Sequence, residues 1–162
     1  GQLLRIGRGE VEVLHTPGHT EGSVTFRVGA QAAFTGDFVF LRSLGRPDLA
    51  GKATAWTAAL WQSLERARRD WSEQMAIYPA HYSSNAERQP DGSVAGRFGD
   101  LLTSNEPLGL RERQLFTDWV AANLGAVPEA YRTIKAVNLG LVAVDSAQAE
   151  ELEAGKNQCA VG

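Results

Sequence analysis

Short apolar runs separated by turn residues dominate the first half of this 162-residue chain. Between Glu10 and His15, Val11 and Val13 alternate with Glu12, and this period of two is typical of a β-strand. The pair Gly29-Ala30 stands between two further runs and favours a tight hairpin turn. We therefore predict a small antiparallel unit, whose first strand lies at an edge or in a hairpin, and one later strand. The predicted strands span residues 3–6, 10–15, 22–28, 31–35 and 75–78.

The spacing of apolar residues changes at Thr54. Trp56, Leu60, Leu64 and Ala67 recur at helical intervals with charged residues between them. This pattern predicts an amphipathic helix, and we expect Thr54 to be its N-cap because a threonine hydroxyl can accept a hydrogen bond from the first turn.

The chain after residue 82 divides into a loop and a helical tail. Residues 83–107 are rich in Ser, Asn, Gly, Asp and Pro and show no sustained period, which predicts a long loop or lid beside His81. Helical spacing, together with glycine and proline punctuation, predicts helices beyond it. They span residues 110–124 with Gly125 as the stop, from Pro128 to about 138–140, and from Ser146 to 153 with Gly155 as the cap.

Composition limits the functions to consider. With 43% hydrophobic and 22% charged residues, the chain is typical of a soluble globular protein of one domain. Its net charge of −3 offers no general attraction to nucleic acid. It has neither an apolar run of roughly 20 residues nor a signal-peptide pattern, so we expect a cytoplasmic protein without a membrane partner. Because Cys159 is the only cysteine, no internal disulfide can form, and we expect a reduced thiol without a catalytic role.

Three short turns carry the residues best suited to bind a metal ion. They read His-Thr-Pro-Gly-His-Thr at 15–20, Phe-Thr-Gly-Asp at 34–37 and Tyr-Pro-Ala-His at 78–81. Each turn follows an apolar strand-like run and presents a His or Asp where the chain reverses, so the three side chains can converge in space. Imidazole and carboxylate groups bind both zinc and iron. The pattern therefore predicts a metal site.

With His19, Asp37 and His81 in this order, the chain resembles the later part of a metallo-β-lactamase-fold protein. The resemblance implies an α/β fold of the αββα sandwich type and metal-binding roles for all three residues, with Asp37 also catalytic. The segment Gly45-Arg46-Pro47-Asp48 resembles the persulfide dioxygenase branch of that superfamily more than its β-lactamases. The likeness covers about the first half of the chain well, and the part beyond Ser83 resembles only extensions of some bacterial members.

One motif that this resemblance implies is not in the sequence. Members of the superfamily begin with a His-x-His-x-Asp-His run, whereas this chain has only His15, His19 and His81 and starts at Gly1 without an initiator methionine. We therefore expect the C-terminal portion of one domain, with the metal turns in residues 1–82 and the loop and helical tail in residues 83–162. Such a portion would lack half of the site and would expose apolar sheet surface. That surface favours a homodimer or association with the missing N-terminal part.

Two enzymatic mechanisms and one inactive alternative follow from the resemblance. In a mononuclear Fe(II) site, His19, Asp37 and a histidine of the missing motif would bind iron, leaving positions for dioxygen and a thiol substrate such as glutathione persulfide. His81 would then lie near the iron without binding it. In a dinuclear Zn(II) site like that of glyoxalase II, Asp37 would bridge the metals, His19 and His81 would each bind one, and hydroxide would attack a thioester or lactam. The third alternative is a catalytically inactive structural module. We expect a persulfide dioxygenase-like parent protein and little or no turnover by this chain alone.

Three more residues are candidates for roles beside the metal. A planar guanidinium suits the carboxylate of a thiol cofactor such as glutathione, but Arg46 is equally suited to be a buried partner of Asp48. We assign Arg46 and Tyr82 to substrate contact, although Tyr82 departs from the acidic residue that persulfide dioxygenases commonly have there. For His15, we expect a hydrogen bond to the backbone at the strand end in place of metal binding.

Overall fold

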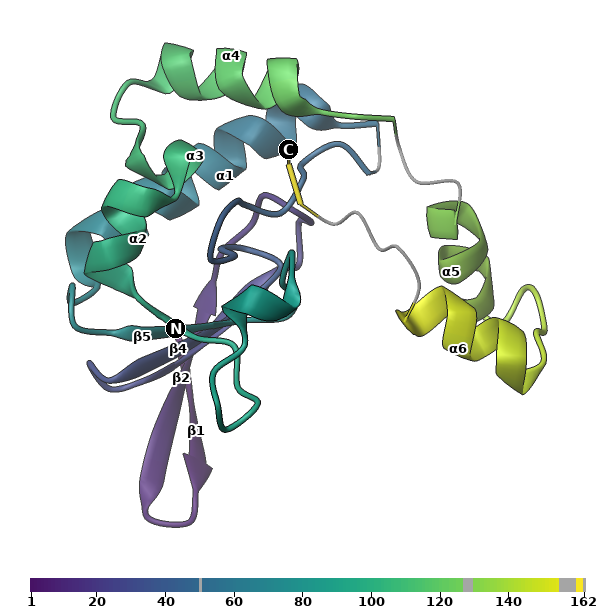
Figure 1. Ribbon diagram of the computed structural model, residues 1–162, viewed down its shortest axis with the longest axis horizontal. Coiled ribbons are helices and arrows are strands. Elements are labelled where there is room, and N and C mark those ends of the chain that lie inside the picture. The colour runs from purple at the N-terminus through teal and green to yellow at the C-terminus, as the bar shows by residue number, and fades with distance from the viewer. Residues whose placement is uncertain (50, 127–129, 155–159, 162) are drawn as a thin grey trace.

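A single six-stranded sheet organises the chain (Figure 1). The computed structural model describes residues 1–49, 51–126, 130–154 and 160–161. Within them the strands follow one another across the sheet in the order β1 to β6. Their bounds are β1 Gln2–Ile6, β2 Gly9–His15, β3 Val24–Val28, β4 Ala32–Gly36, β5 Ala76–Pro79 and β6 Gly96–Arg97.

Neighbouring strands of the sheet are antiparallel except for β4 and β5. β1 to β4 form an antiparallel meander, which confirms the predicted antiparallel unit with its first strand at the edge. β4 and β5 are parallel, and the long helix between them makes the crossover that parallel neighbours require. β6 then returns antiparallel to β5.

Helix α1, Ala53–Asp70, is that crossover and covers one face of the sheet. Its apolar side buries Leu60, Leu64 and Ala67 in a core that includes Ala33 and Ile77 from the strands. The predicted apolar stripe is therefore confirmed.

The predicted N-cap of α1, Thr54, is wrong. The helix begins at Ala53, and Lys52 occupies the cap position without a side-chain hydrogen bond. The amide of Trp56 donates to the Lys52 carbonyl, so the first helical turn starts before Thr54.

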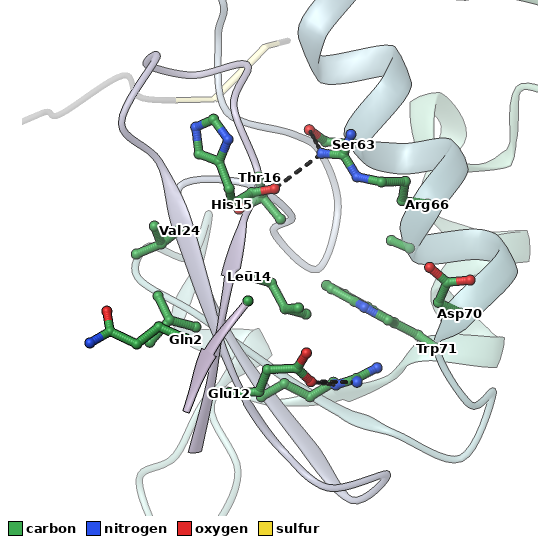
Figure 2. A pocket seen from close by; sticks show the side chains of 14 residues that line it. Gln2, Glu12, Leu14, His15, Thr16, Val24, Ser63, Arg66, Asp70 and Trp71 are labelled. Atoms are coloured by element: carbon green, nitrogen blue, oxygen red, sulfur yellow. Dashed lines mark hydrogen bonds and ion pairs between the residues drawn. The ribbon is translucent and has the colours of Figure 1, made fainter. Parts of the chain in front are cut away.

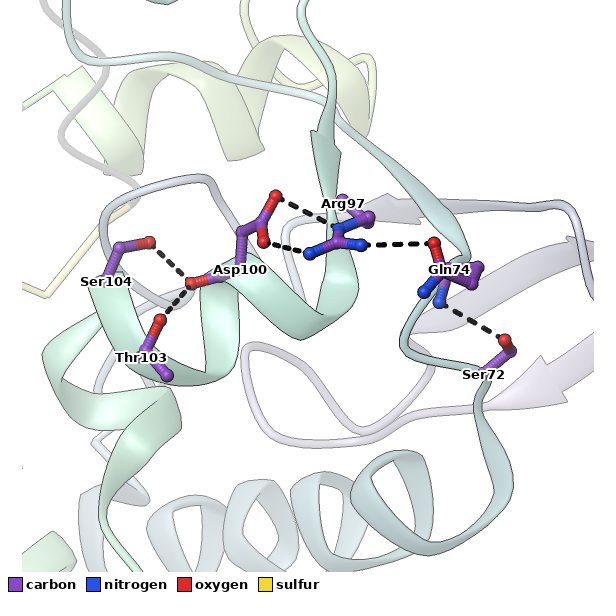
Figure 3. Close-up of polar contacts among 6 residues, drawn as sticks. All are labelled: Ser72, Gln74, Arg97, Asp100, Thr103 and Ser104. Atoms are coloured by element: carbon purple, nitrogen blue, oxygen red, sulfur yellow. Dashed lines mark hydrogen bonds and ion pairs between the residues drawn. The ribbon is translucent and has the colours of Figure 1, made fainter.

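The predicted long loop over residues 83–107 is also wrong. This segment contains a 3₁₀ turn, Asn85–Glu87, then β6, α2 over Phe98–Ser104 and α3 over Glu106–Gly109. Each helix is too short to show a helical period in the sequence, and burial of Phe98, Leu101 and Leu108 in the core stabilises them. Figure 3 shows the start of α2, where Arg97 bridges Asp100 and Gln74.

The helical tail matches its predicted order. Helix α4, Arg113–Asn123, packs on α1, with the rings of Trp61 and Phe116 centred 5.3 Å apart. It starts three residues later than predicted, because α3 precedes it and Leu110 is extended. Helices α5, Ala130–Asn138, and α6, Ser146–Ala154, stand apart from the sheet (Figure 1). The predicted punctuation at Pro128 and Gly155, and Cys159, lies outside the described residues.

The face of the sheet opposite α1 carries exposed apolar side chains. Cross-strand pairing aligns Val13, Phe26, Phe34 and Tyr78 in one row, and alternation places this row away from the helix. Phe26 and Phe34 are 40% and 47% exposed. The expected apolar sheet surface is therefore present.

Among the helices of the described ranges, none combines the length and apolar character needed to cross a membrane.

Candidate metal centre

The sheet topology brings the three predicted metal turns to one edge. β2, β4 and β5 run in the same direction, since two antiparallel steps separate β2 from β4, and β5 is parallel to β4. His19 follows β2, Asp37 follows β4 and His81 follows β5. All three therefore leave the sheet at the same end, as residues at the carboxyl ends of such strands do.

The Asp37 carboxylate lies between two imidazole rings. Its Oδ2 is 3.5 Å from Nε2 of His19, and its Oδ1 is 3.2 Å from Nε2 of His81. The sequence predicted that these three side chains would meet, and the structure brings them together. His81 is the more open of the two histidines, with 41% of its side chain exposed, and its ring packs near Phe40.

His19 is held in one orientation. It is buried, and its Nδ1 lies 2.9 Å from the carbonyl oxygen of Arg46. A carbonyl can only accept, so Nδ1 carries the proton and the Nε2 lone pair faces Asp37. Burial lowers the pKa of His19, while Asp37 and the Arg46 carbonyl raise it less. A neutral ring whose Nδ1–H donates to a carbonyl, with Nε2 left as an acceptor, is an arrangement of metal-binding histidines in proteins.

The donors fit a cation in type but supply only part of a ligand set. Asp37 Oδ1 is buried and makes no hydrogen bond, although Nε2 of His81 lies 3.2 Å from it, and such an atom is costly to bury unless a cation or a donor faces it. Across the described residues, however, no group of three His, Cys, Asp or Glu side chains is spaced to hold a metal ion together. His19, Asp37 and His81 thus provide oriented donors that need further ligands to complete a centre.

Arg46 is 2% exposed and its guanidinium contacts other parts of this protein. Nε and Nη2 donate to the two oxygens of Asp48 at 2.7 and 2.9 Å. Nη1 and Nη2 also donate to the carbonyls of Ala126 and Gly125, beyond the end of α4. The buried pair with Asp48 is therefore the alternative that the structure shows, and substrate contact by Arg46 stays a prediction.

The two other candidates lie at the surface. Tyr82 is 45% exposed, with the Arg88 guanidinium 5.6 Å from its ring centre, and its substrate role stays a prediction. His15 is exposed and donates from Nε2 to the carbonyl of Glu21 at 2.7 Å, which is the backbone hydrogen bond expected for it.

A hollow of about 830 Å³ between β2 and α1 is separate from these donors (Figure 2). None of His19, Asp37 and His81 lines it. Its main polar groups already have partners, since Glu12 pairs with Arg27, and Arg66 donates to the His15 carbonyl. The hollow is therefore not the candidate site.

Sequence reasoning missed two residues beside the site, Gly45 and Asn105. Gly45 packs directly on the Asp37 backbone, and the fully buried Asn105 bonds to the segment that follows Asp37. Gly45 was part of a recognised motif without an assigned role. Asn105 lay in the predicted loop, where only the Asn-Glu-Pro sequence hinted at a helix start.

Comparison with curated proteins links part of the chain to an enzyme. It is 37% identical over 82 residues to the persulfide dioxygenase ETHE1, mitochondrial, of Mus musculus, a match that covers 50% of this chain and 31% of that protein. The human protein of the same name is 35% identical over the same length. An uncharacterized protein of Mycobacterium leprae is 37% identical over 94 residues, or 55% of this chain and 42% of that one. No protein-family model matches.

Solved structures extend the likeness over most of the chain. A metallo-β-lactamase from Staphylococcus aureus superposes with a TM-score of 0.72 and 22% identity, covering 90% of this chain and 44% of that one. ETHE1 from Myxococcus xanthus gives 0.69 and 24%, covering 88% and 59%. The chain thus spans less than two thirds of these proteins. The shared fold reaches into the helical tail, beyond the half that the sequence resemblance covered well. The chain is therefore a metallo-β-lactamase-fold protein.

Proposed function

We propose that this chain supplies part of the metal centre of a persulfide dioxygenase-like enzyme, which oxidises glutathione persulfide or a similar thiol substrate at a single non-haem Fe(II). The observation that carries the proposal is the Asp37 carboxylate, which lies between Nε2 of His19 and Nε2 of His81 and whose buried Oδ1 makes no hydrogen bond. The partial identity to persulfide dioxygenase ETHE1 supports a dioxygenase over a hydrolase, and His and carboxylate donors with open positions suit Fe(II) in such enzymes.

Each residue of the centre has a role that follows from its contacts. His19 and Asp37 would hold the iron, which when bound offers open positions to dioxygen and to the substrate sulfur. The Arg46 carbonyl keeps the proton of His19 on Nδ1, so that Nε2 stays available as a ligand. His81 contacts the other oxygen of Asp37 and orients the carboxylate without itself binding iron. Tyr82, exposed next to His81, is our candidate for substrate contact.

The test is metal analysis of the longest natural form of the protein, purified without chelator, with oxygen consumption measured on glutathione persulfide. We expect about one iron per chain, and a loss of more than ten-fold in both iron and oxygen consumption in Asp37→Ala. His15→Ala is the matched control, because His15 is exposed and bonds only the backbone. Two zinc ions per chain, or no bound metal, would overturn the proposal in favour of a hydrolase or of an inactive structural module.

A further inference from the structure

A tight hairpin connects the two parts of the candidate centre. Residues 38–45, here called the 38–45 hairpin, connect Asp37 to Arg46. Val39 pairs with Leu44, the Phe40 amide donates to the Ser43 carbonyl at 3.0 Å, and the Gly45 amide donates to the Phe38 carbonyl. One end of the hairpin thus holds the Asp37 carboxylate, and the other holds the Arg46 carbonyl that orients His19.

The base of the hairpin leaves no room for a side chain at Gly45. A Cβ placed on Gly45 would lie 1.8 Å from the carbonyl oxygen of Asp37 and 3.0 Å from Cβ of His19. The backbone of Gly45 is therefore in direct contact with both residues. A shift of the hairpin would change the positions of His19 and Asp37 together.

Asn105, between α2 and α3, holds the tip of the hairpin. It is fully buried, and its Nδ2 donates to the carbonyls of Phe40 at 3.0 Å and Ser43 at 2.9 Å. Its Oδ1 accepts from the Leu108 amide at 3.2 Å, so one side chain joins the hairpin to the first turn of α3. Phe40, whose carbonyl it binds, also packs its ring near His81.

The end of the 38–45 hairpin that leads to Arg46 also contacts residues 160–161. Gly45 pairs with Ala160, the Val161 amide donates to the Leu44 carbonyl at 2.9 Å, and the Ser43 hydroxyl donates to the Val161 carbonyl. The tip carbonyls of Phe40 and Ser43 face Asn105 in this arrangement, so Asn105 is the side chain that determines how the turn itself is held.

We infer that Asn105 is a positioning residue of the metal centre: it holds the 38–45 hairpin in the register that aims the Arg46 carbonyl at Nδ1 of His19. Asn105 lies in the segment predicted as a long loop or lid, and this part of it would instead be a fixed support of the site. What the oriented ring then binds rests on the proposed function, but the orientation itself is a property of the metal-free chain.

The test reads the proton position on His19 by ¹⁵N NMR of the histidine rings in the metal-free full chain at pH 7.5. We expect the Nδ1–H form of His19 in the unmodified chain. In Asn105→Asp, a carboxylate with no proton to donate faces two carbonyl oxygens, so the Nδ1–H form should fall to half or less. His15, which donates from Nε2, is an internal reference and should not change.

Asn123→Asp is the matched control, because Asn123 donates to a single carbonyl, that of Trp119, within α4. It should leave the His19 signal unchanged. If Asn105→Asp does not fold, Asn105→Ser, which keeps one donor and adds no charge, decides the question. A folded Asn105 variant with the His19 signal of the unmodified chain would overturn the inference.

The two proposals fail separately. The NMR experiment tests the orientation of His19 whether or not the longest natural form of the protein binds iron. If the inference holds, Asn105→Ser should also weaken Co(II) binding by the longest natural form at least ten-fold, as loss of support for a ligand does. Unchanged Co(II) affinity beside a changed His19 signal would contradict the assignment of Asn105 to the metal centre.

Discussion

Gly45 shows how closely the backbone packs around the candidate centre. Because its absent Cβ would overlap the Asp37 carbonyl, Gly45→Ala must displace backbone and not only a flexible side chain. We expect a loss of about 3 kcal/mol in the free energy of unfolding, measured by urea denaturation. Gly22→Ala is the control, since no atom lies within 4 Å of the added Cβ. Equal losses in the two variants would contradict this account.

Two arginines make the same paired contact with an aspartate but differ in burial, and the buried one, Arg46, also donates to the carbonyls of Gly125 and Ala126. Arg46 and Arg69 each bind an aspartate through Nε and Nη2, but their side chains are 2% and 68% exposed. Lysine cannot make the paired contact, so Arg46→Lys should destabilise the protein by about 3 kcal/mol. Arg69→Lys should leave the urea midpoint unchanged, because water screens the exposed pair. A large effect at both positions would show that burial is not the cause.

The lowered pKa of His19 makes stability depend on pH. Burial keeps the ring neutral in the folded chain, so below about pH 6.5 the unfolded chain takes up a proton that the folded chain does not. The free energy of unfolding should therefore fall as the pH drops, by at most about 1.4 kcal/mol per pH unit, until the folded ring also protonates. Urea unfolding of the metal-free chain at pH 7.5 and 5.5 measures this. His19→Gln should reduce the fall, and His15→Gln should not.

At the scale of elements, the sequence predicted β1 to β5, α1 and α4 from hydrophobic periods that local spacing reveals, and α5 and α6 from proline, serine and glycine punctuation. It failed over residues 83–107, where α2 and α3 are stabilised by burial and not by a period of their own. A helix of four or seven residues is marginal by itself, so only contact with the core makes it form.

This view of α2 predicts the cost of removing its anchor. Phe98 is fully buried at the start of α2, so Phe98→Ala should lower the free energy of unfolding by about 3–5 kcal/mol. Leu115→Ala, at a 51% exposed position of α4, is the control and should change it little. If residues 98–104 were a mobile lid, the two variants would have similar stability in thermal or urea unfolding.

At the scale of the whole molecule, the main feature is the exposed apolar face of the sheet opposite α1. Phe26 and Phe34 lie side by side across β3 and β4, and Phe34 stacks on Tyr78 at 5.1 Å. An apolar surface of this kind favours association with a second copy of the chain. We propose such association for this face.

Sedimentation measurements over a range of concentrations test it. Phe34→Thr keeps a residue suited to a strand but removes the ring, so it should shift the chain toward the 17.5 kDa monomer. Leu115→Thr, which removes an exposed apolar side chain from α4, should not. A monomer at all concentrations before any substitution would contradict self-association through this face.

The sequence by itself determined the donor types, the turns that present them and most of the regular elements, because these depend on residue chemistry and on spacing along a few neighbouring positions. Only the tertiary structure decided that β2, β4 and β5 run in one direction and so bring His19, Asp37 and His81 to one edge. It also decided that Arg46 binds the carbonyls of Gly125 and Ala126 and that Asn105 supports the 38–45 hairpin. These contacts join residues up to 80 positions apart, as between Arg46 and Ala126. Local spacing carries no information about them, because they form only when the core packs.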